Sequence, residues 1–179
     1  DKETDVLVIG YGALGACAAI EAYDNGSKVL IIEKMAQPGG NTAISSGGFM
    51  VPQDGPTALK YLTATYDLAN SEKDDELLNT FCKEIMGVKD WMTGLKEGTE
   101  LWIYGHAGFQ NLPGWEVIDK YRVRGKKRSG DCLFDLYRYA VEEKRHIPVM
   151  LETPAVQLIQ KDGQVVGAVA SRNGKNINI

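Results

Sequence analysis

The chain opens with two short apolar runs that enclose a helix-forming segment. Residues 5–10 read DVLVIG and residues 28–32 read KVLII. Both runs are continuous rather than alternating, which is typical of strands buried on both faces of a parallel sheet. Between them, residues 14–25 are small, apolar and alanine-rich, and Gly26 stands where a helix C-cap glycine is expected. Strand, helix and strand within about thirty residues predict one right-handed βαβ crossover.

The middle of the chain carries a weaker pattern. Residues 37–48 (QPGGNTAISSGG) predict a loop or flexible turn by composition. Residues 56–70 and 75–95 have helical apolar spacing. The expected apolar face of the second helix consists of Leu77, Leu78, Phe81, Ile85, Val88 and Met92. From Gly94 to Asp131 the periodicity is lost, so we expect loops over a partly helical region.

Regular patterns return towards the C-terminus. Residues 133–145 predict a helix, and residues 147–151 predict a short strand. Residues 155–160 and 165–171 flank Asp162-Gly163, which is a hairpin signal. The face expected to be buried on the helix consists of Leu133, Leu136, Tyr137 and Ala140.

Bulk properties narrow the function classes. Twenty Lys and Arg against 24 Asp and Glu give a net charge of −4, which provides no reason to expect a nucleic-acid partner. No apolar run approaches the ~20 residues of a membrane-spanning helix. Cys17, Cys82 and Cys132 are too far apart to indicate a disulfide framework or a zinc site, so no metal is expected. We expect a reducing, cytoplasmic location; the alternative is the periplasm, if an upstream signal has been removed.

A dinucleotide fingerprint lies at the first turn. Residues 10–15 (GYGALG) match G-x-G-x-x-G, in which Gly10 allows the tight turn, Gly12 the approach of a pyrophosphate, and Gly15 close helix–strand packing. Glu33 ends the second strand, where a carboxylate can accept both ribose hydroxyls of an adenosine. This context weighs against a turn that only packs a helix on a sheet. The βαβ unit alone leaves FAD and NAD open.

The second glycine cluster adds a family resemblance. With VLVIGYGALG and VLIIEKMAQPGGNTAISSGGF, residues 5–50 resemble the fumarate reductase/succinate dehydrogenase flavoprotein family, in its soluble fumarate reductase and 3-ketosteroid dehydrogenase branch, and residues 131–171 match it more loosely. The resemblance implies an α/β fold: a Rossmann-like FAD/NAD(P)-binding domain with a parallel sheet, a helical insertion and a C-terminal β-hairpin. It divides the chain into residues 1–50 (βαβ unit and flavin loop), 51–132 (helical and loop insertion) and 133–179 (returning helix and strands).

The resemblance also implies an FAD laid along the βαβ unit. Glu33 would bind the adenosine ribose, with Lys34 and Met35 beside the adenine, and Ala155 and Val156 would approach the adenine through backbone atoms. The residues expected to hold the pyrophosphate are Gly10, Gly12, Ala13, Leu14 and Gly15. Those expected beneath the ribityl chain and isoalloxazine are Gly40, Asn41, Thr42, Ser45, Ser46, Gly47 and Gly48.

Two departures from the family pattern are informative. Asn41 stands where succinate dehydrogenases carry a flavin-linking histidine, so we expect non-covalent FAD. Family members also continue through a mobile capping domain and a final FAD-domain strand, and this chain stops about where that strand would begin. We therefore expect an N-terminal portion of such an enzyme, incomplete at its C-terminus, whose catalytic residues are unknown.

Three function hypotheses follow. The first is an FAD-dependent oxidoreductase that transfers a hydride between flavin N5 and an activated carbon–carbon bond of an organic acid or a ketosteroid. Its partners would be a small-molecule substrate and either a missing capping segment or an electron-donor protein. The second is a non-catalytic FAD-binding fragment or one part of a split enzyme. The third, an NAD-dependent dehydrogenase, leaves QPGGNTAISSGG unexplained.

Several chemically interesting residues are interpreted as structural. His106 lacks a visible constellation, and His146 is interpreted as a helix-end cation. Trp91, Trp102, Trp115 and Cys17 are interpreted as packing residues. The basic run is interpreted as a solvated loop in preference to an anion-binding patch. It comprises Lys120, Arg122, Arg124, Lys126, Lys127 and Arg128.

Overall fold

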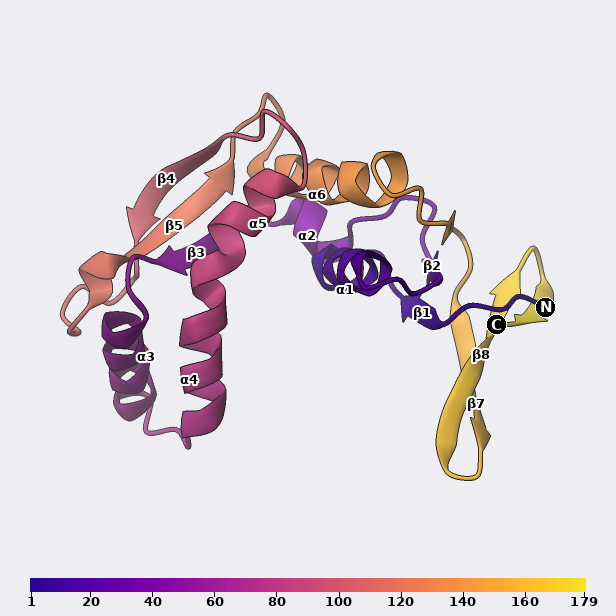
Figure 1. Ribbon diagram of the computed structural model, residues 1–179, viewed down its shortest axis with the longest axis horizontal. Coiled ribbons are helices and arrows are strands. Elements are labelled where there is room, and N and C mark those ends of the chain that lie inside the picture. The colour runs from indigo at the N-terminus through magenta and orange to yellow at the C-terminus, as the bar shows by residue number, and fades with distance from the viewer. The chain divides into compact units, whose positions relative to one another are not determined.

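A computed structural model describes residues 1–179 (Figure 1). The chain divides into two compact units, one formed by Asp1–Ser45 with Leu133–Ile179 and the other by Ser46–Cys132. The first unit contains two sheets and the second unit one, and each unit has its own buried side chains. No helix is both long enough and apolar enough to cross a membrane.

The predicted βαβ crossover is present in the first unit. β1 (Val6–Ile9) and β2 (Val29–Ile32) are parallel, and β2 pairs on its other side with β6 (Val149–Met150). All four residues of β2 are buried, as the continuous apolar run predicts. α1 (Ala13–Asp24) buries Ala16, Ala19 and Ile20, small or compact side chains that let the helix lie close to the strands.

The returning helix of this unit confirms the predicted buried face. α6 (Ser129–Arg138) continues into one π-helical turn, η3 (Tyr139–Glu143). Leu133, Leu136, Tyr137 and Ala140 are all buried. Beyond them, Arg145 makes a two-point ion pair with Asp24 at the end of α1, at 2.6 Å and 2.7 Å. The pair ties the C-terminal end of this helix to α1.

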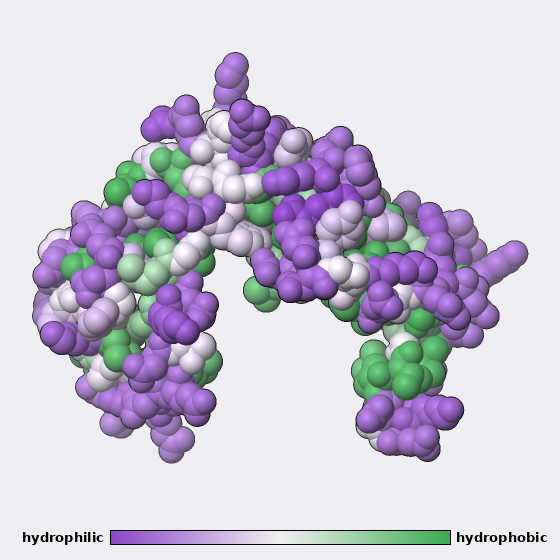
Figure 2. Space-filling view, in the orientation of Figure 1, coloured by the Kyte–Doolittle hydropathy of each residue, from purple (hydrophilic) through white to green (hydrophobic).

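A three-stranded antiparallel meander closes the first unit. β7 (Ala155–Lys161) and β8 (Gln164–Arg172) turn at Asp162-Gly163, both at positive φ, which confirms the predicted hairpin. β9 (Lys175–Asn178) then pairs with β8, a strand that the sequence analysis missed. The Lys2 N–H donates to the Asn178 carbonyl at 2.9 Å, so the two termini lie side by side. The hairpin exposes an apolar surface formed by Val156, Leu158, Val165 and Val166 (Figure 2).

The second unit contains a sheet where loops were expected. β3 (Gly48–Pro52), β5 (Ile118–Val123) and β4 (Leu101–His106) form an antiparallel sheet with β5 in the centre. The interpretation of Gly94–Asp131 as loops over a partly helical region was therefore wrong. The strands lack a short-hairpin signal because a long segment with one 3₁₀ turn, η2 (Trp115–Val117), joins β4 to β5.

The second unit also contains three α-helices, α3, α4 and α5. α3 (Gly55–Leu68) begins at Asp54, whose carboxylate accepts from the Thr57 N–H at 2.8 Å. The expected single helix over 75–95 is three pieces: α4 (Asp75–Glu84), the 3₁₀ turn η1 (Ile85–Gly87) and α5 (Val88–Gly94). Its predicted face was partly wrong, since Leu77 is 64% and Phe81 45% exposed whereas Leu78 and Cys82 are buried. The 3₁₀ turn η1 interrupts the α-helical period between α4 and α5.

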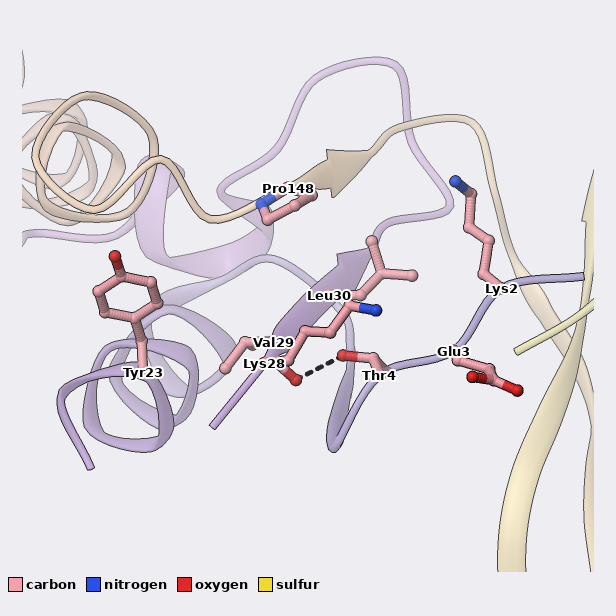
Figure 3. Close-up of a pocket in the computed structure, with 8 residues that line it drawn as sticks. All are labelled: Lys2, Glu3, Thr4, Tyr23, Lys28, Val29, Leu30 and Pro148. Atoms are coloured by element: carbon pink, nitrogen blue, oxygen red, sulfur yellow. Dashed lines mark hydrogen bonds between the residues drawn. The ribbon is translucent and has the colours of Figure 1, made fainter. Parts of the chain in front are cut away.

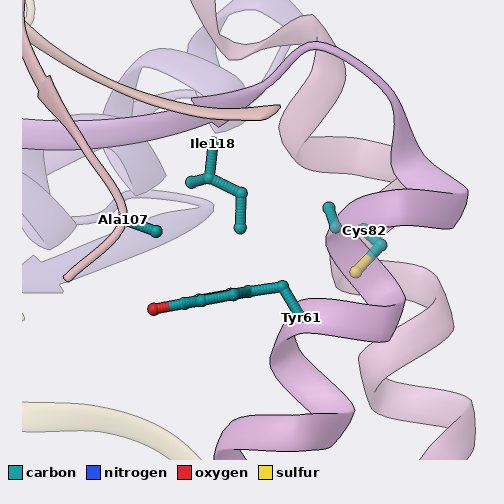
Figure 4. Close-up of a cluster of buried hydrophobic side chains, with 5 residues drawn as sticks. Tyr61, Cys82, Ala107 and Ile118 are labelled. Carbon is teal, nitrogen blue, oxygen red and sulfur yellow. The ribbon is translucent and has the colours of Figure 1, made fainter. Parts of the chain in front are cut away.

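The helices and the sheet of the second unit share a small core. Tyr61 of α3 and Cys82 of α4 lie against Ile118 and Ala107 (Figure 4), and Ala58 completes the cluster. The Tyr61 hydroxyl accepts from the Phe109 N–H at 3.1 Å, so its polar end is satisfied. Burial raises the pKa of the Cys82 thiol and keeps it neutral.

We expect Asp24→Asn to destabilise the protein in a pH-dependent way. The hydrogen bond from Arg145 holds the pKa of Asp24 below its usual value. The pair therefore contributes fully above the unfolded-state pKa of about 3.9, and its contribution is lost as the pH falls through the lower native pKa. Because Asp24 is 45% exposed, screening limits the loss at pH 7 to about 1 kcal/mol.

Urea unfolding at pH 7 and at pH 3 measures this effect. The matched control is Asp67→Asn, which removes an exposed ion pair to Lys73 at 3.4 Å and should change stability far less. An Asp24→Asn penalty of equal size at both pH values would contradict a charge-dependent contribution.

Candidate functional site

The turn after β1 has the geometry that the fingerprint predicts. Gly10 has φ +100°, and its N–H donates to the Ile32 carbonyl at 2.8 Å. A Cβ built on Gly10 would stand in open space, the kind of cradle that a bound group can fill. A Cβ on Gly15 would overlap the Gly10 carbonyl oxygen, so only glycine allows α1 to pack this close.

The N-terminus of α1 presents free backbone donors. Gly12 is the N-cap and offers no side-chain cap, and the first turn carries no acidic residue. The Ala13 N–H is already used, because it donates to the Thr42 hydroxyl at 3.0 Å. The N–H groups of Leu14 and Gly15 precede the first intrahelical hydrogen bond, from Ala16 to Gly12. Together with the helix dipole they suit an anionic group such as a pyrophosphate.

Glu33 is the best-defined polar side chain of this region. It is 8% exposed, and its carboxylate accepts from two backbone donors: the Tyr11 N–H at 2.7 Å and the Met35 N–H at 2.8 Å. These bonds fix both oxygens, and each oxygen keeps a further lone pair. The carboxylate is therefore pre-oriented to accept hydroxyl groups such as those of a ribose.

The second glycine cluster folds back onto the first. Residues 37–48 were expected to be a loop, but Gly40–Ile44 forms a short helix, α2. The Gly39 N–H donates to the Tyr11 carbonyl at 2.7 Å, and Thr42 accepts from Ala13. Gly40 has φ +47° with open space where a Cβ would stand. Five residues rich in Gly, Asn and Thr are too few to show helical periodicity, which explains the error.

A small cavity opens at the carboxyl ends of β1 and β2. It has a volume of about 180 Å³ and brings together Gly10, Glu33 and Ala155, which are far apart in the sequence. The remaining lining residues are Ile9, Ile32, Lys34, Thr153 and Pro154. This edge of a parallel sheet is where such folds bind ligands, and the volume suits one end of a dinucleotide.

Two of the predicted adenine contacts, Lys34 and Ala155, line this cavity. The register between β7 and β8 shifts between Ala155 and Gln157, which leaves Val156 without a cross-strand partner. Such a bulge frees backbone polar groups, as the predicted contact through backbone atoms requires. Lys34 and Met35 are exposed. The Thr153 N–H donates to the Glu33 carbonyl at 2.8 Å and holds this segment against the end of β2.

A larger cavity of the first unit lies at the opposite edge. It has a volume of about 340 Å³ and is lined by residues that precede the strands, among them Thr4, Lys28 and Pro148 (Figure 3). The Thr4 hydroxyl donates to the Lys28 carbonyl at 2.5 Å, so these two polar groups already satisfy each other. The amino ends of parallel strands are not where these folds bind nucleotides, so volume alone does not identify the site.

Three of the predicted flavin-loop residues, Ser46, Gly47 and Gly48, belong to the second unit. Two of them have a packing reason to be glycine. A Cβ on Gly47, which has φ +63°, would overlap the Ser129 carbonyl, and a Cβ on Gly48 would overlap the Tyr104 hydroxyl. Asn41, Ser45 and the other predicted residues lie in the first unit.

His106 has a partner that the sequence did not reveal. Its Nδ1 lies 3.1 Å from Oδ1 of Asp119. Asp119 is 4% exposed, and its other oxygen, Oδ2, accepts from the Gln53 amide at 3.2 Å. The expectation that nothing forms a constellation with His106 was therefore wrong. Asp119 faces His106 across the β4–β5 register, a pairing visible only once both strands are recognised.

The basic run is also not the single solvated loop that was expected. Lys120 and Arg122 belong to β5. Farther along, Arg124 pairs with Glu100 at 3.2 Å and Arg128 pairs with Asp131 at 2.9 Å. The six cations thus differ in structure and in whether they are neutralised.

Comparison with known families decides the identity of the dinucleotide. A family described as FAD binding domain matches residues 5–179. The chain belongs to this FAD-binding domain family. The cofactor is therefore FAD, and the NAD-dependent alternative is set aside.

Relatives of this FAD-binding domain confirm the resemblance seen in the sequence. The fumarate reductase (cytochrome) of Shewanella frigidimarina is 30% identical over 173 residues, which cover 91% of this chain and 29% of that protein. The urocanate reductase of Eggerthella lenta is 28% identical over 179 residues, 94% of this chain and 28% of that protein. The chain spans less than a third of the length of these two relatives.

A solved structure confirms the predicted fold class. The 3-ketosteroid Δ1-dehydrogenase from Sterolibacterium denitrificans superposes with a TM-score of 0.85 at 19% identity, covering 98% of this chain and 45% of that one. At this identity the likeness establishes the α/β fold of the FAD-binding domain. It does not assign an activity.

Gly15→Ala should destabilise the FAD-binding domain by about 2–3 kcal/mol, because its Cβ meets a backbone oxygen that has no room to move. Gly87→Ala is the matched control: Gly87 has φ −80° and open space around an added Cβ, so the substitution should be neutral or slightly stabilising. Urea unfolding of both variants measures the difference. Equal midpoints would show that α1 can move away from β1 without cost.

Proposed function

We propose that the protein is an FAD-dependent oxidoreductase acting on an activated carbon–carbon bond of an organic acid or a ketosteroid. The observation that carries the proposal is the fixed Glu33 carboxylate beside the open Gly10 turn, at the ligand-binding edge of the parallel sheet. The family membership adds FAD, and the curated relatives named above are reductases of fumarate and urocanate. Bound FAD supplies hydride transfer at its N5 position.

The residues of this chain would bind and orient the cofactor. The backbone N–H groups of Leu14 and Gly15 would hold the pyrophosphate, and Glu33 the ribose hydroxyls. Lys34, Met35, Ala155 and Val156 would lie beside the adenine. The cluster from Gly40 to Gly48 would run beneath the isoalloxazine. The proposed FAD-binding domain consists of the βαβ unit and flavin loop over residues 1–50, an insertion over 51–132, and the returning helix and strands over 133–179.

The proton donor and further groups that bind the substrate would come from a capping segment or from another polypeptide. This follows from the share of each relative that the chain spans, which is below a third. The same fact supports a second candidate, an FAD-binding part of a split enzyme. An electron-donor protein would complete the system. The proposed compartment is a reducing, cytoplasmic one, and the three cysteines, which form no disulfide, fit it.

The flavin should be held without a covalent bond, because Asn41 has no nucleophilic ring nitrogen. Purified protein is expected to absorb near ~450 nm, and acid precipitation should release all of that absorbance into the supernatant. The comparison variant is Asn41→His, which restores the side chain able to form the link. Flavin that stays with the wild-type pellet would contradict the assignment, and colourless wild-type protein that takes up no FAD would contradict the proposed function.

Glu33→Gln should weaken FAD binding by about tenfold to a hundredfold. A glutamine has one acceptor oxygen, so either the Tyr11 or the Met35 N–H faces an amide donor, and stability should also fall by about 1–3 kcal/mol. Quenching of FAD fluorescence measures the affinity. Glu152→Gln, which alters an exposed carboxylate near the end of β6, should bind FAD within twofold of the wild type. Equal affinities for the two variants would remove Glu33 from the site.

A further inference from the structure

Arg122 occupies an unusual position at the centre of the second unit's sheet. Side chains of a strand alternate between faces, so Arg122 shares its face of β5 with Lys120. In the register it lies opposite Gly48 of β3 on one side and Trp102 of β4 on the other. Its guanidinium carbon is 3.9 Å from the centre of the Tyr104 ring and 5.9 Å from that of Trp102. Two aromatic rings therefore hold it in place.

No carboxylate of the chain neutralises Arg122. Its neighbour Arg124 pairs with Glu100, and Arg128 pairs with Asp131. Arg122 has no ion pair, and its Nε is buried without a hydrogen-bond acceptor. Lys120, two residues earlier on the same face, also lacks a carboxylate partner. Unpaired buried donors and charges are costly and rare, and the aromatic rings compensate only part of that cost.

The location of Arg122 links it to the flavin segment. Gly48 ends the cluster that the proposed function places beneath the isoalloxazine, and it pairs directly with Arg122. The Tyr104 hydroxyl lies where a Gly48 side chain would stand, and the Tyr104 ring carries the guanidinium. All of these residues belong to the second unit, so their arrangement does not depend on the other one.

We propose that Arg122 binds a carboxylate of the substrate, which makes the substrate class an unsaturated carboxylic acid and not a ketosteroid. The assignment rests on the proposed function. Because Nε is buried, the two terminal nitrogens provide the fork, a geometry that matches a carboxylate with two hydrogen bonds. The carboxylate supplies the missing counter-charge, and Lys120 adds positive potential on the same face. An uncharged steroid ketone would leave both cations unneutralised.

The test titrates the FAD-loaded protein, produced from its complete gene, with succinate and with dimethyl succinate, and follows the flavin spectrum. Arg122→Met keeps an apolar stem against the rings and removes the charge, and it should weaken succinate binding about tenfold to a hundredfold. Arg124→Met is the matched control, one residue beyond the end of β5, and it should stay within twofold because its charge is exposed and already paired. FAD content should be unchanged in both.

Two further measurements test the role of Arg122 if the Arg122→Met variant does not bind FAD. Arg122→Lys retains the charge but not the fork and should lose at least about fivefold. The wild type should bind succinate at least about tenfold more tightly than its uncharged diester. Succinate affinity within twofold of wild type in the loaded Arg122 variants, or a wild type that binds the diester or androst-4-ene-3,17-dione better than succinate, overturns it. FAD-free wild-type protein would instead contradict the proposed function itself.

Discussion

The two hydrogen bonds received by the Glu33 carboxylate are the constraint on which the nucleotide site depends. They come from Tyr11, inside the turn after β1, and from Met35, just beyond β2. One buried side chain thus fixes the carboxyl ends of two parallel strands relative to each other. The Thr153 N–H then donates to the Glu33 carbonyl, and this bond attaches the segment before β7 to the end of β2 as well. Backbone geometry around the turn is set before any ligand arrives, so little ordering is left to be done on binding.

Tyr11 shows why this arrangement tolerates little change. Its N–H is bound to Glu33, its carbonyl accepts from Gly39, and its ring packs edge-on against Phe134 of α6 with centroids 5.2 Å apart. Burial raises the pKa of its phenol far above the usual value, so the group stays neutral. A residue that the fingerprint treats as variable therefore links the glycine turn, the second glycine cluster and the returning helix.

Local patterns were predictable, and non-local ones were not. The βαβ crossover, the buried face of α6 and the β7–β8 hairpin each depend on residues close together in the chain. Hydrophobic periodicity and turn residues predict such local structures directly from the sequence. The β3–β5–β4 sheet is different, because its strands are far apart in the sequence: Pro52, for example, pairs with Ile118. No short turn sequence joins these strands, so nothing local predicts that they pair. The partner of His106 was missed for the same reason: Asp119 becomes its neighbour only through that register. For the candidate site, the glycines and Glu33 were visible as a motif, but the bonds that fix Glu33 were not.

The basic run shows what a charge count cannot convey. Arg122, Arg124 and Arg128 are equal in the sequence, yet the fold gives them different electrostatic situations. Arg124 and Arg128 are exposed and paired, so their charges are largely cancelled and screened. Arg122 is placed by strand alternation against two aromatic rings and forms no ion pair with a carboxylate. A cation that a fold holds rigidly and leaves without a counter-charge costs stability in the isolated chain. Such a cost is understandable where an anionic ligand offsets it, because the same lack of a partner that destabilises the empty protein strengthens binding.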